Sequence, residues 1–454
     1  MPNGSHMNSA LPRIAVGTIQ AGADGTAMLW ALMDSLESAG VRVQNFASRA
    51  HFTPRDAATA ITGLAPRHLD SWLMGEETCR ALFVRGCRLS DLALVEGSFV
   101  SSQGSAERGS SLARLCEWLD LPALAIVDAR RLECCRLPPR PPRAAGILLD
   151  RVRDPREACQ LQTHFESLWN LPVVGWLGTL SGMRSAIDAL PSGSRAPIDL
   201  CHALCRELLP KLKLGRINGL ASQRPLSHCP ECPKVAAGTK PVLHVAVAYD
   251  DALRAYFPDT LDLLEAQGAV VTDFSPLHDD RLPYDTDVVY LGCGHPERYA
   301  QALSENDCMM LALKNHLCCG RRIFAECGGL AYLCHELQLP NGERWPMVGA
   351  LDVTAHYCET PTSPDPLELT LAADTWLGAK GQRFRGYRNP RWSVSPHGAT
   401  DGCAAEAGHE LDLLHRHQAV GSCLHLDFAA QPELMARFFE PHEQGRPLLA
   451  SHQA

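Results

Sequence analysis

Short apolar segments alternate with segments of helical spacing along most of the chain, and this alternation constrains the fold more than any other feature of the sequence. In the first half the spacing predicts a helix over residues 26–39, which Gly40 ends. The strands expected there cover residues 13–17, 92–96, 123–127, 146–149 and 173–176. Because enough chain separates them for crossover helices, the pattern predicts an α/β domain with a doubly wound, mostly parallel sheet.

The second half shows the same alternation and then changes character. Strands are expected at residues 242–249, 269–274, 288–291 and 322–325, and helices at residues 256–267, 330–337 and 432–439. Between residues 347 and 388 the pattern looks more antiparallel. These features predict a second α/β domain.

A segment without apolar periodicity, residues 219–240, separates the two halves. It is rich in Pro, Ser and Cys, so we interpret it as a linker between domains at residues 8–218 and 241–454. Cys229 and Cys232 in this linker have zinc-ligand spacing. A second pair is missing, which favours ordinary thiols over a zinc or redox site.

Charge and hydropathy exclude several classes of partner. The chain has 42 Lys and Arg against 51 Asp and Glu, and no basic block that could follow a phosphate backbone, which argues against nucleic acid. No apolar run reaches the ~18 residues of a membrane-spanning helix, which argues against a membrane. The 19 cysteines have no framework spacing and indicate reduced thiols, so a soluble cytoplasmic protein is expected.

Cys327 lies between an apolar strand and Gly328-Gly329, at the start of a helical stretch. A strand, a sharp turn through small residues and a helix form the strained elbow on which many enzymes hold a nucleophile. The helix N-terminus lowers the pKa of such a thiol and offers backbone N–H groups to an oxyanion. A buried core cysteine is the alternative interpretation.

A thiol nucleophile needs a base, and His425 near the end of the chain is the candidate. Asp427 follows two residues later, and residues two apart on a strand face the same side. This spacing predicts that Asp427 orients the imidazole of His425 in a Cys-His-acid triad. A histidine with a purely structural role is the alternative.

Four motifs of the second half together resemble the class I glutamine amidotransferase-like domain of the cobyrinic acid a,c-diamide synthase family. They are Tyr256-Phe257-Pro258-Asp259, residues 291–297, residues 324–333 and residues 422–426. The resemblance implies that Cys327 attacks the side-chain amide of glutamine, the co-substrate. A thioester forms and ammonia leaves, while His425 moves the proton.

The resemblance also assigns the glycine turn before this nucleophile. Gly292, Gly294 and Gly328 are implied to form the oxyanion hole and to bind glutamine. Cys293 and His295 differ from the usual Gly and Tyr of the family, which changes the wall of the pocket but not its backbone.

The first half resembles the synthetase domain of the same family. Its motifs lie in the family's order, at Thr62-Gly63, residues 69–77, Val95-Glu96-Gly97 and residues 146–152. In relatives this P-loop-like domain uses Mg²⁺ and ATP to phosphorylate a substrate carboxylate, and ammonia then displaces the phosphate. Within these motifs Asp70 is a candidate for substrate binding.

The loop that would hold phosphate departs from the family. It runs from Gly17 through Thr18 and Asp24 to Thr26, with Asp24 at the position of the phosphate-binding lysine. A P-loop points N–H groups and one ammonium at the phosphates, so a carboxylate there repels the ligand.

The metal side of this site departs as well. An ungapped alignment places His51 and Pro54 where relatives carry two Asp, Ala47 where they carry Lys, and Gln103 where they carry another Asp. Glu96 is retained as a vestigial magnesium ligand, although one carboxylate makes a poor site. We therefore expect a degenerate P-loop with weak Mg-ATP binding and assign no certain metal site; a scaffold without nucleotide is an equal alternative.

Three arginines close to two aromatic residues are candidates for binding the substrate. Arg385, Arg388 and Arg391 lie beside Tyr387 and Trp392. Forked guanidinium pairing and stacking suit a polycarboxylate macrocycle. A solvated charged face is the alternative.

Two functions from different classes fit these features. The first is glutamine-dependent amidation of peripheral carboxylates of a modified tetrapyrrole. Cobyrinic or hydrogenobyrinic acid is the usual substrate of the family, and the altered loops favour a siroheme-type macrocycle. The second is a glutaminase or a non-catalytic tetrapyrrole-binding subunit without ATP chemistry of its own. The resemblance is compatible with a homodimer.

Overall fold

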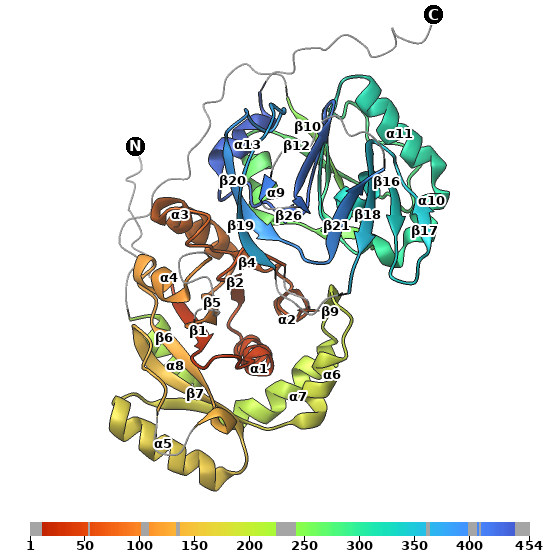
Figure 1. Ribbon diagram of the computed structural model, residues 1–454. Coiled ribbons are helices and arrows are strands. Elements are labelled where there is room, and N and C mark those ends of the chain that lie inside the picture. The colour runs from red at the N-terminus through yellow and green to blue at the C-terminus, as the bar shows by residue number, and fades with distance from the viewer. Residues whose placement is uncertain are drawn as a thin grey trace, which may run out of the picture. The chain divides into compact units, whose positions relative to one another are not determined.

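The computed structural model describes residues 11–52, 55–100, 109–132, 137–223, 242–359, 364–397, 406–407 and 410–440. The chain divides into two compact units, Met1–Cys232 and Pro233–Ala454. Each unit contains a largely parallel sheet with helices, which confirms the predicted α/β fold class (Figure 1). Pro54, Gln103, Cys229 and Cys232 lie outside the described residues.

The first unit is built on a seven-stranded parallel sheet with the order β4-β2-β5-β1-β6-β7-β8. Its strands are β1 (Arg13–Thr18), β2 (Val43–Ala47), β4 (Arg67–His68), β5 (Leu92–Ser98), β6 (Ala123–Asp128), β7 (Ala144–Val152) and β8 (Val173–Gly178). The five strands expected from apolar runs all form. β2 was not expected because Gln44 and Asn45 interrupt its apolar pattern, although both are buried.

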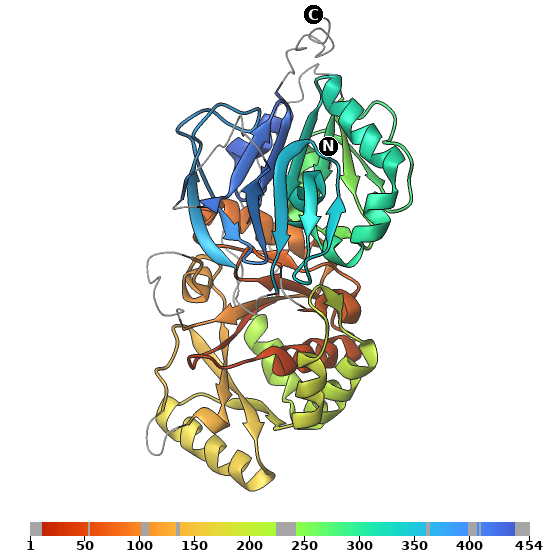
Figure 2. The same ribbon diagram turned by 45° about the vertical axis from the view of Figure 1, so that its right-hand side comes forward.

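Helices cover both faces of this sheet (Figure 2). The helices are α1 (Thr26–Ser38), α2 (Ala58–Thr62), α3 (Glu76–Gly86), α4 (Leu112–Trp118), α5 (Pro155–Trp169), α6 (Ser181–Asp188), α7 (Ile198–Leu208) and α8 (Leu214–Ala221). One core joins Val16 and Leu124 to α1, α7 and α8, and the other joins Val127 and Leu149 to α5. α8 ends at Ala221, within the segment that the sequence assigns to the linker. A two-stranded ribbon joins β3 (Arg55–Asp56) and β9 (Ser194–Arg195).

The second unit is built on a six-stranded sheet with the order β12-β10-β13-β15-β25-β24. Its strands are β10 (His244–Ala248), β12 (Val270–Phe274), β13 (Val288–Leu291), β15 (Arg322–Glu326), β24 (Leu413–Arg416) and β25 (Ala419–Ser422), and only the β24–β25 pair is antiparallel. Its helices are α9 (Pro258–Ala266), α10 (Ala300–Glu305), α11 (Asp307–Cys318), α12 (Gly328–Leu333) and α13 (Pro432–Phe438).

Shorter strands form smaller sheets beside this one. Two of them have two strands each: β11 (Leu253–Ala255) pairs with β14 (Cys293–Gly294), and β22 (Glu406–Ala407) pairs with β23 (Glu410–Leu411). A four-stranded sheet contains β16 (Cys334–Gln338), β17 (Arg344–Pro346), β18 (Leu351–Tyr357) and β21 (Trp392–Pro396). A three-stranded sheet contains β19 (Asp365–Thr370), β20 (Arg383–Arg388) and β26 (Leu424–His425). β20 runs antiparallel to β26 and places Tyr387 opposite His425. Among the described residues no helix is long and apolar enough to cross a bilayer.

The helix predicted over residues 330–337 is wrong in its second half. α12 ends at Leu333, and the next residues form strand β16, which pairs with β17 and β18. Leu330, Leu333 and Leu337 have helical spacing, but the hydrogen bonds of β16 to its neighbouring strands determine the conformation of residues 334–338.

Candidate active site

Cys327 lies on a strained turn between β15 and α12. Its backbone adopts φ +50° and ψ −107°, a conformation that residues other than glycine rarely adopt. The chain can approach its neighbours here because the next two residues lack side chains: a Cβ on Gly329 would lie 2.2 Å from the carbonyl oxygen of Leu291, and one on Gly328 would lie 2.8 Å from Cδ of Pro296. The thiol is thus held at a sharp elbow, as Cys327-Gly328-Gly329 predicted.

The structure brings the predicted base to this thiol. Nδ1 of His425 lies 3.9 Å from Sγ of Cys327 and 3.0 Å from Sγ of Cys293. Cys327, Cys293 and His425 expose 0%, 3% and 3% of their surface, so the three groups meet out of water. The proximity of Cys327 and His425 agrees with the sequence; the contact of Cys293 was not expected.

These groups shift each other's pKa in opposite directions. Burial raises the pKa of the Cys327 thiol, but the hydrogen bond from Cys293 and the charge of His425 outweigh it and bring the pKa to about 5. Burial lowers the pKa of His425, but the negative charge of Cys327 raises it above its ordinary value. Burial keeps Cys293 protonated by raising its pKa. The arrangement therefore favours a thiolate–imidazolium pair that accepts a hydrogen bond from Cys293.

Glu326 is a part of the site that the sequence interpretation missed. Its Oε1 accepts a hydrogen bond from Tyr290 Oη at 2.6 Å, and its Oε2 accepts one from the backbone N–H of Leu426 at 3.1 Å. Burial and then the charge of Cys327 raise the pKa of Glu326 to about 8. The one sequence feature that could have indicated it is that Glu326 is an acidic residue at the end of the apolar strand β15. Glu326 holds the backbone next to His425.

Asn389 is another residue of the site that the sequence pattern did not identify. Its side chain forms a hydrogen bond with Cys327 that lowers the pKa of the thiol. Its backbone N–H donates to the carbonyl of Cys423 at 3.0 Å. The sequence drew attention to this stretch only through its arginines.

Asp427 lies beyond the end of β26, so the two-residue strand spacing does not describe it. Its Oδ1 accepts hydrogen bonds from the backbone N–H of Ala429 at 3.0 Å and of Ala430 at 3.4 Å, and from Thr260 Oγ1 at 3.4 Å. The carboxylate stabilises the turn that leads to α13, and its role toward His425 stays a prediction.

The glycine turn before the nucleophile divides into two parts. The N–H of Gly292 donates to Tyr256 Oη at 2.9 Å, so it is already engaged. Gly294 and Gly328 approach closely, because a Cβ on Gly328 would lie 3.0 Å from the backbone nitrogen of Gly294. The Gly292 N–H is therefore less available as an oxyanion donor, and the roles of Gly294 and Gly328 toward the oxyanion stay predictions.

The predicted substrate residues lie in different surroundings. Asp70 in the first unit is fully buried and accepts backbone hydrogen bonds from Ala50 at 3.0 Å and Trp72 at 2.9 Å. This bonding gives it a structural role in its loop, while its role toward substrate stays a prediction.

The three arginines lie in the second unit. Arg385 pairs with Glu368 at 2.7 Å and Arg388 with Asp412 at 2.7 Å. The pKa of His425 is raised overall, chiefly by the charge of Cys327 against the effect of burial, and the positive charge of Arg391 opposes this rise, which indicates that Arg391 lies near the imidazole. Of the three, Arg391 has the clearest electrostatic link to the nucleophile site.

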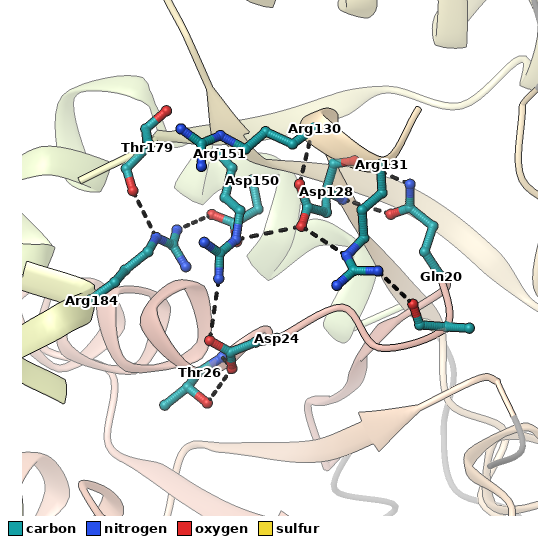
Figure 3. Close-up of polar contacts among 11 residues, drawn as sticks. Gln20, Asp24, Thr26, Asp128, Arg130, Arg131, Asp150, Arg151, Thr179 and Arg184 are labelled. Atoms are coloured by element: carbon teal, nitrogen blue, oxygen red, sulfur yellow. Dashed lines mark hydrogen bonds and ion pairs between the residues drawn. The ribbon is translucent and has the colours of Figure 1, made fainter. Parts of the chain in front are cut away.

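In the first unit, the loop expected to bind phosphate already holds a carboxylate (Figure 3). Oδ1 of Asp24 accepts hydrogen bonds from the backbone N–H of Thr26 at 3.0 Å and from its hydroxyl at 2.6 Å. Oδ2 of Asp24 forms an ion pair with Nη2 of Arg151 at 3.4 Å. Asp24 therefore occupies the N-terminus of α1, where a P-loop places phosphate.

Arg151 and Arg131 tie this loop to the strands beside it. Arg151 lies near the end of β7 with φ +56°, where the register of β7 with β8 shifts. Its Nε lies 3.4 Å from Oδ2 of Asp128. Arg131 pairs with the same carboxylate at 3.4 Å and donates to the carbonyl of Ala21 at 2.9 Å. Gln20 exchanges two hydrogen bonds with the backbone of Asp128, at 2.7 and 3.1 Å. Figure 3 shows that contacts with Asp128, Arg131 and Arg151 hold this loop in place.

The remaining nucleotide candidates serve the fold. Gly17 and Thr18 lie in β1, where a Cβ on Gly17 would lie 2.5 Å from Leu112 Cδ2. Glu96 accepts a hydrogen bond from Asn45 Nδ2 at 3.1 Å, and burial raises its pKa. Among the described residues, Glu96 belongs to no group of three close metal ligands. The residue that does not fit Mg-ATP is Asp24, whose carboxylate lies at the N-terminus of α1 where the phosphates would bind.

The chain is similar to known proteins both in its second unit and over most of its length. Residues 244–432 match the sequence profile of the CobB/CobQ-like glutamine amidotransferase domain. The chain is 29% identical to a cobyrinate a,c-diamide synthase from Syntrophotalea carbinolica, over 83% of this chain and 85% of that protein. It is 29% identical to a cobyrinate a,c-diamide synthase from Salmonella typhimurium, over 81% and 83%. It is 27% identical to a hydrogenobyrinate a,c-diamide synthase from Streptomyces coelicolor, over 96% and 98%.

Proposed function

Because the chain belongs to the cobyrinic acid a,c-diamide synthase family, we propose that it releases ammonia from glutamine and transfers it to peripheral carboxylates of a modified tetrapyrrole. The observation that carries this proposal is the buried contact of Cys327 and His425 at a strained elbow. The relatives are named for cobyrinate and hydrogenobyrinate, which makes a cobyrinate-type macrocycle the first candidate. A siroheme-type macrocycle is the second, because Arg385 to Arg391 depart from the family's pattern.

The glutaminase step follows from the geometry of the site. The Cys327 thiolate attacks the side-chain carbonyl carbon of glutamine, and the N–H groups of Gly294 and Gly328 stabilise the resulting oxyanion. His425 gives its proton to the departing ammonia, which leaves a thioester on Cys327. Neutral His425 then takes a proton from water, which hydrolyses the thioester to glutamate and frees the thiol.

Amide formation on the macrocycle requires an activated carboxylate that ammonia can attack. Mg-ATP would supply that activation in the family. The Asp24 carboxylate does not fit the phosphates of Mg-ATP. This mismatch favours a second candidate function: a glutaminase that passes ammonia to a separate activating protein, with the first unit binding the macrocycle.

The test combines the full chain with glutamine labelled with ¹⁵N in its amide. Cobyrinic acid, hydrogenobyrinic acid and a siroheme-type macrocycle are each supplied with and without Mg-ATP, and mass spectrometry detects ¹⁵N in the macrocycle. Labelled amide on one macrocycle supports the proposal and names the substrate. Glutamate release without labelled macrocycle under any condition would instead support the second candidate, and absence of both would refute the glutaminase assignment.

A further inference from the structure

Three metal-binding donor atoms converge at the nucleophile. Sγ of Cys293, Sγ of Cys327 and Nδ1 of His425 all lie within 4.8 Å of one another. Among the residues that the structure describes, no other group of three His, Cys, Asp or Glu side chains brings its donor atoms that close. In the proposed mechanism Cys327 is the nucleophile and His425 carries the proton, while Cys293 serves only as a hydrogen-bond donor to the thiolate.

The separations of these atoms suit a tetrahedral metal ion. With Zn–S bonds of about 2.3 Å and a Zn–N bond of about 2.0 Å, the sulfur and nitrogen ligands of a tetrahedron lie about 3.6 Å apart. The two observed S···N distances, 3.0 and 3.9 Å, fall on either side of that value. Changes of a few tenths of an ångström would satisfy both.

From this geometry we propose that Cys293, Cys327 and His425 form a binding site for one thiophilic divalent cation such as Zn²⁺, and that the bound cation silences the nucleophile. Two thiolates and an imidazole select Zn²⁺, Co²⁺ or Cd²⁺ over Mg²⁺ and Ca²⁺, which prefer oxygen. Three protein ligands leave a fourth position for water.

The charge balance of binding is favourable. The cation displaces the S–H proton of Cys293 and the imidazolium proton of His425, so two protons leave and no electron is transferred. Two thiolates then neutralise the two positive charges, which lowers the cost of placing the ion in a buried site. The nearby Glu326 carboxyl already accepts hydrogen bonds from Tyr290 and Leu426, so the two sulfurs and the imidazole nitrogen remain the donor set.

The first arm of the test measures binding without reference to activity. Co²⁺ is titrated into the reduced, metal-free full chain, and the thiolate-to-cobalt charge-transfer band and the visible bands of tetrahedral cobalt are recorded. To keep other thiols from contributing, serine replaces the five exposed cysteines and the five outside the described residues: Cys134, Cys135, Cys159, Cys229, Cys232, Cys308, Cys318, Cys319, Cys358 and Cys403. We expect one tetrahedral cobalt per chain, displaced by Zn²⁺.

Variants in this background identify the ligands. Cys293→Ala should weaken cobalt binding by at least about 100-fold, because loss of a ligand exceeds the effect of losing an outer partner, and should halve the charge-transfer intensity of any residual complex. Cys334→Ala is the matched control, since Cys334 is equally buried but its thiol contacts the carbonyl of Leu330. If Cys293→Ala fails to fold by circular dichroism, Cys293→Ser replaces it. Equal affinity in the Cys293 variant and the control, or octahedral cobalt bands, would overturn the site.

The second arm, which rests on the proposed function, measures glutamine hydrolysis. One equivalent of Zn²⁺ should abolish glutamate release, and a chelator should restore it. Cobalt binding without inhibition overturns the silencing role. A metal-free protein that releases no glutamate contradicts the proposed function instead, while the cobalt titration still decides the site.

Discussion

Nη2 of Arg151 lies 3.4 Å from Oδ2 of Asp24, and this pair links the end of β7 to the start of α1. The Asp24 carboxylate accepts a hydrogen bond from the N–H of Thr26, so a negatively charged side chain of the loop binds the helix N-terminus where a phosphate would otherwise bind. Arg151 supplies the matching positive charge. The loop is therefore complete without a ligand.

The first prediction concerns nucleotide binding. Mg-ATP should bind with a Kd in the millimolar range or weaker, because the phosphates would have to displace Asp24 and would be repelled by its negative charge. This Kd corresponds to a standard binding free energy of about −4 kcal/mol or a less negative value. Isothermal calorimetry at neutral pH measures this. Asp24→Lys should tighten binding only partly, because Ala47 and His51 still replace the charged residues of relatives. Asp199→Lys, which makes the same charge change on α7, should leave the weak binding as it is. Micromolar affinity in the unaltered chain would contradict the prediction.

The second prediction concerns the nucleophile. Cys327→Ser should abolish glutamine-dependent glutamate release, because a serine hydroxyl in this position lacks the low pKa of the thiol. Amidation supported by ammonium chloride should remain wherever the unaltered chain shows it. Cys334→Ser replaces an equally buried thiol outside the site and serves as the control. Wild-type rates of glutamate release in Cys327→Ser would remove Cys327 from the mechanism.

The third prediction uses the pKa of Cys327. The rate of alkylation by iodoacetamide should rise with pH through about 5, where the thiolate forms, rather than near the ordinary thiol value of 9.0. Cys293→Ala removes a hydrogen-bond donor to the thiolate, so it should move this transition to higher pH. Mass spectrometry of the peptide that contains Cys327 follows the reaction at each pH. An identical pH profile in the variant would show that Cys293 does not stabilise the thiolate.

Local sequence patterns predicted most strands of the two main sheets and the elbow, because apolar runs and a Cys-Gly-Gly turn act within a few residues. They did not predict β16, where helical leucine spacing competes with pairing to β18 from farther along the chain. They did not predict β2 either, because Gln44 and Asn45 are polar but buried.

The electrostatics of both sites depend on contacts over long sequence separations. Cys293 meets His425 across 132 positions, and Arg151 meets Asp24 across 127. Spacing along the chain carries no information about such pairs, which only the packing of several elements fixes. The sequence could therefore mark Asp24 as anomalous, but not show that Arg151 neutralises it.

The fourth prediction concerns stability and pH. Glu326 has a pKa of about 8 in the folded chain against an ordinary value of 4.5, so the folded state holds its proton more tightly than the unfolded state. Its contribution to stability is therefore full below pH 4.5 and declines as the pH rises toward 8. Glu326→Gln keeps a polar group of the same shape without a titrating proton, so it should flatten this decline. Urea unfolding at several pH values measures it, with Glu305→Gln on α10 as an exposed control. An unchanged slope in Glu326→Gln would assign the pH dependence elsewhere.

The last prediction separates a positioning role of Asp427 from a structural one. Asp427→Asn keeps an oxygen that can accept the N–H groups of Ala429 and Ala430, so the turn before α13 should persist and the melting temperature should change little. If the carboxylate also orients and stabilises the His425 imidazolium, the variant should lose at least ~10-fold in kcat, as expected when a triad acid is neutralised. The pH at which kcat falls on the basic side should also decrease, because the imidazolium would lose a negative partner. His425→Ala sets the reference for complete loss of the base. Unchanged kcat and pH profile in Asp427→Asn would restrict Asp427 to the turn, and unchanged kinetics in His425→Ala would refute the triad as a whole.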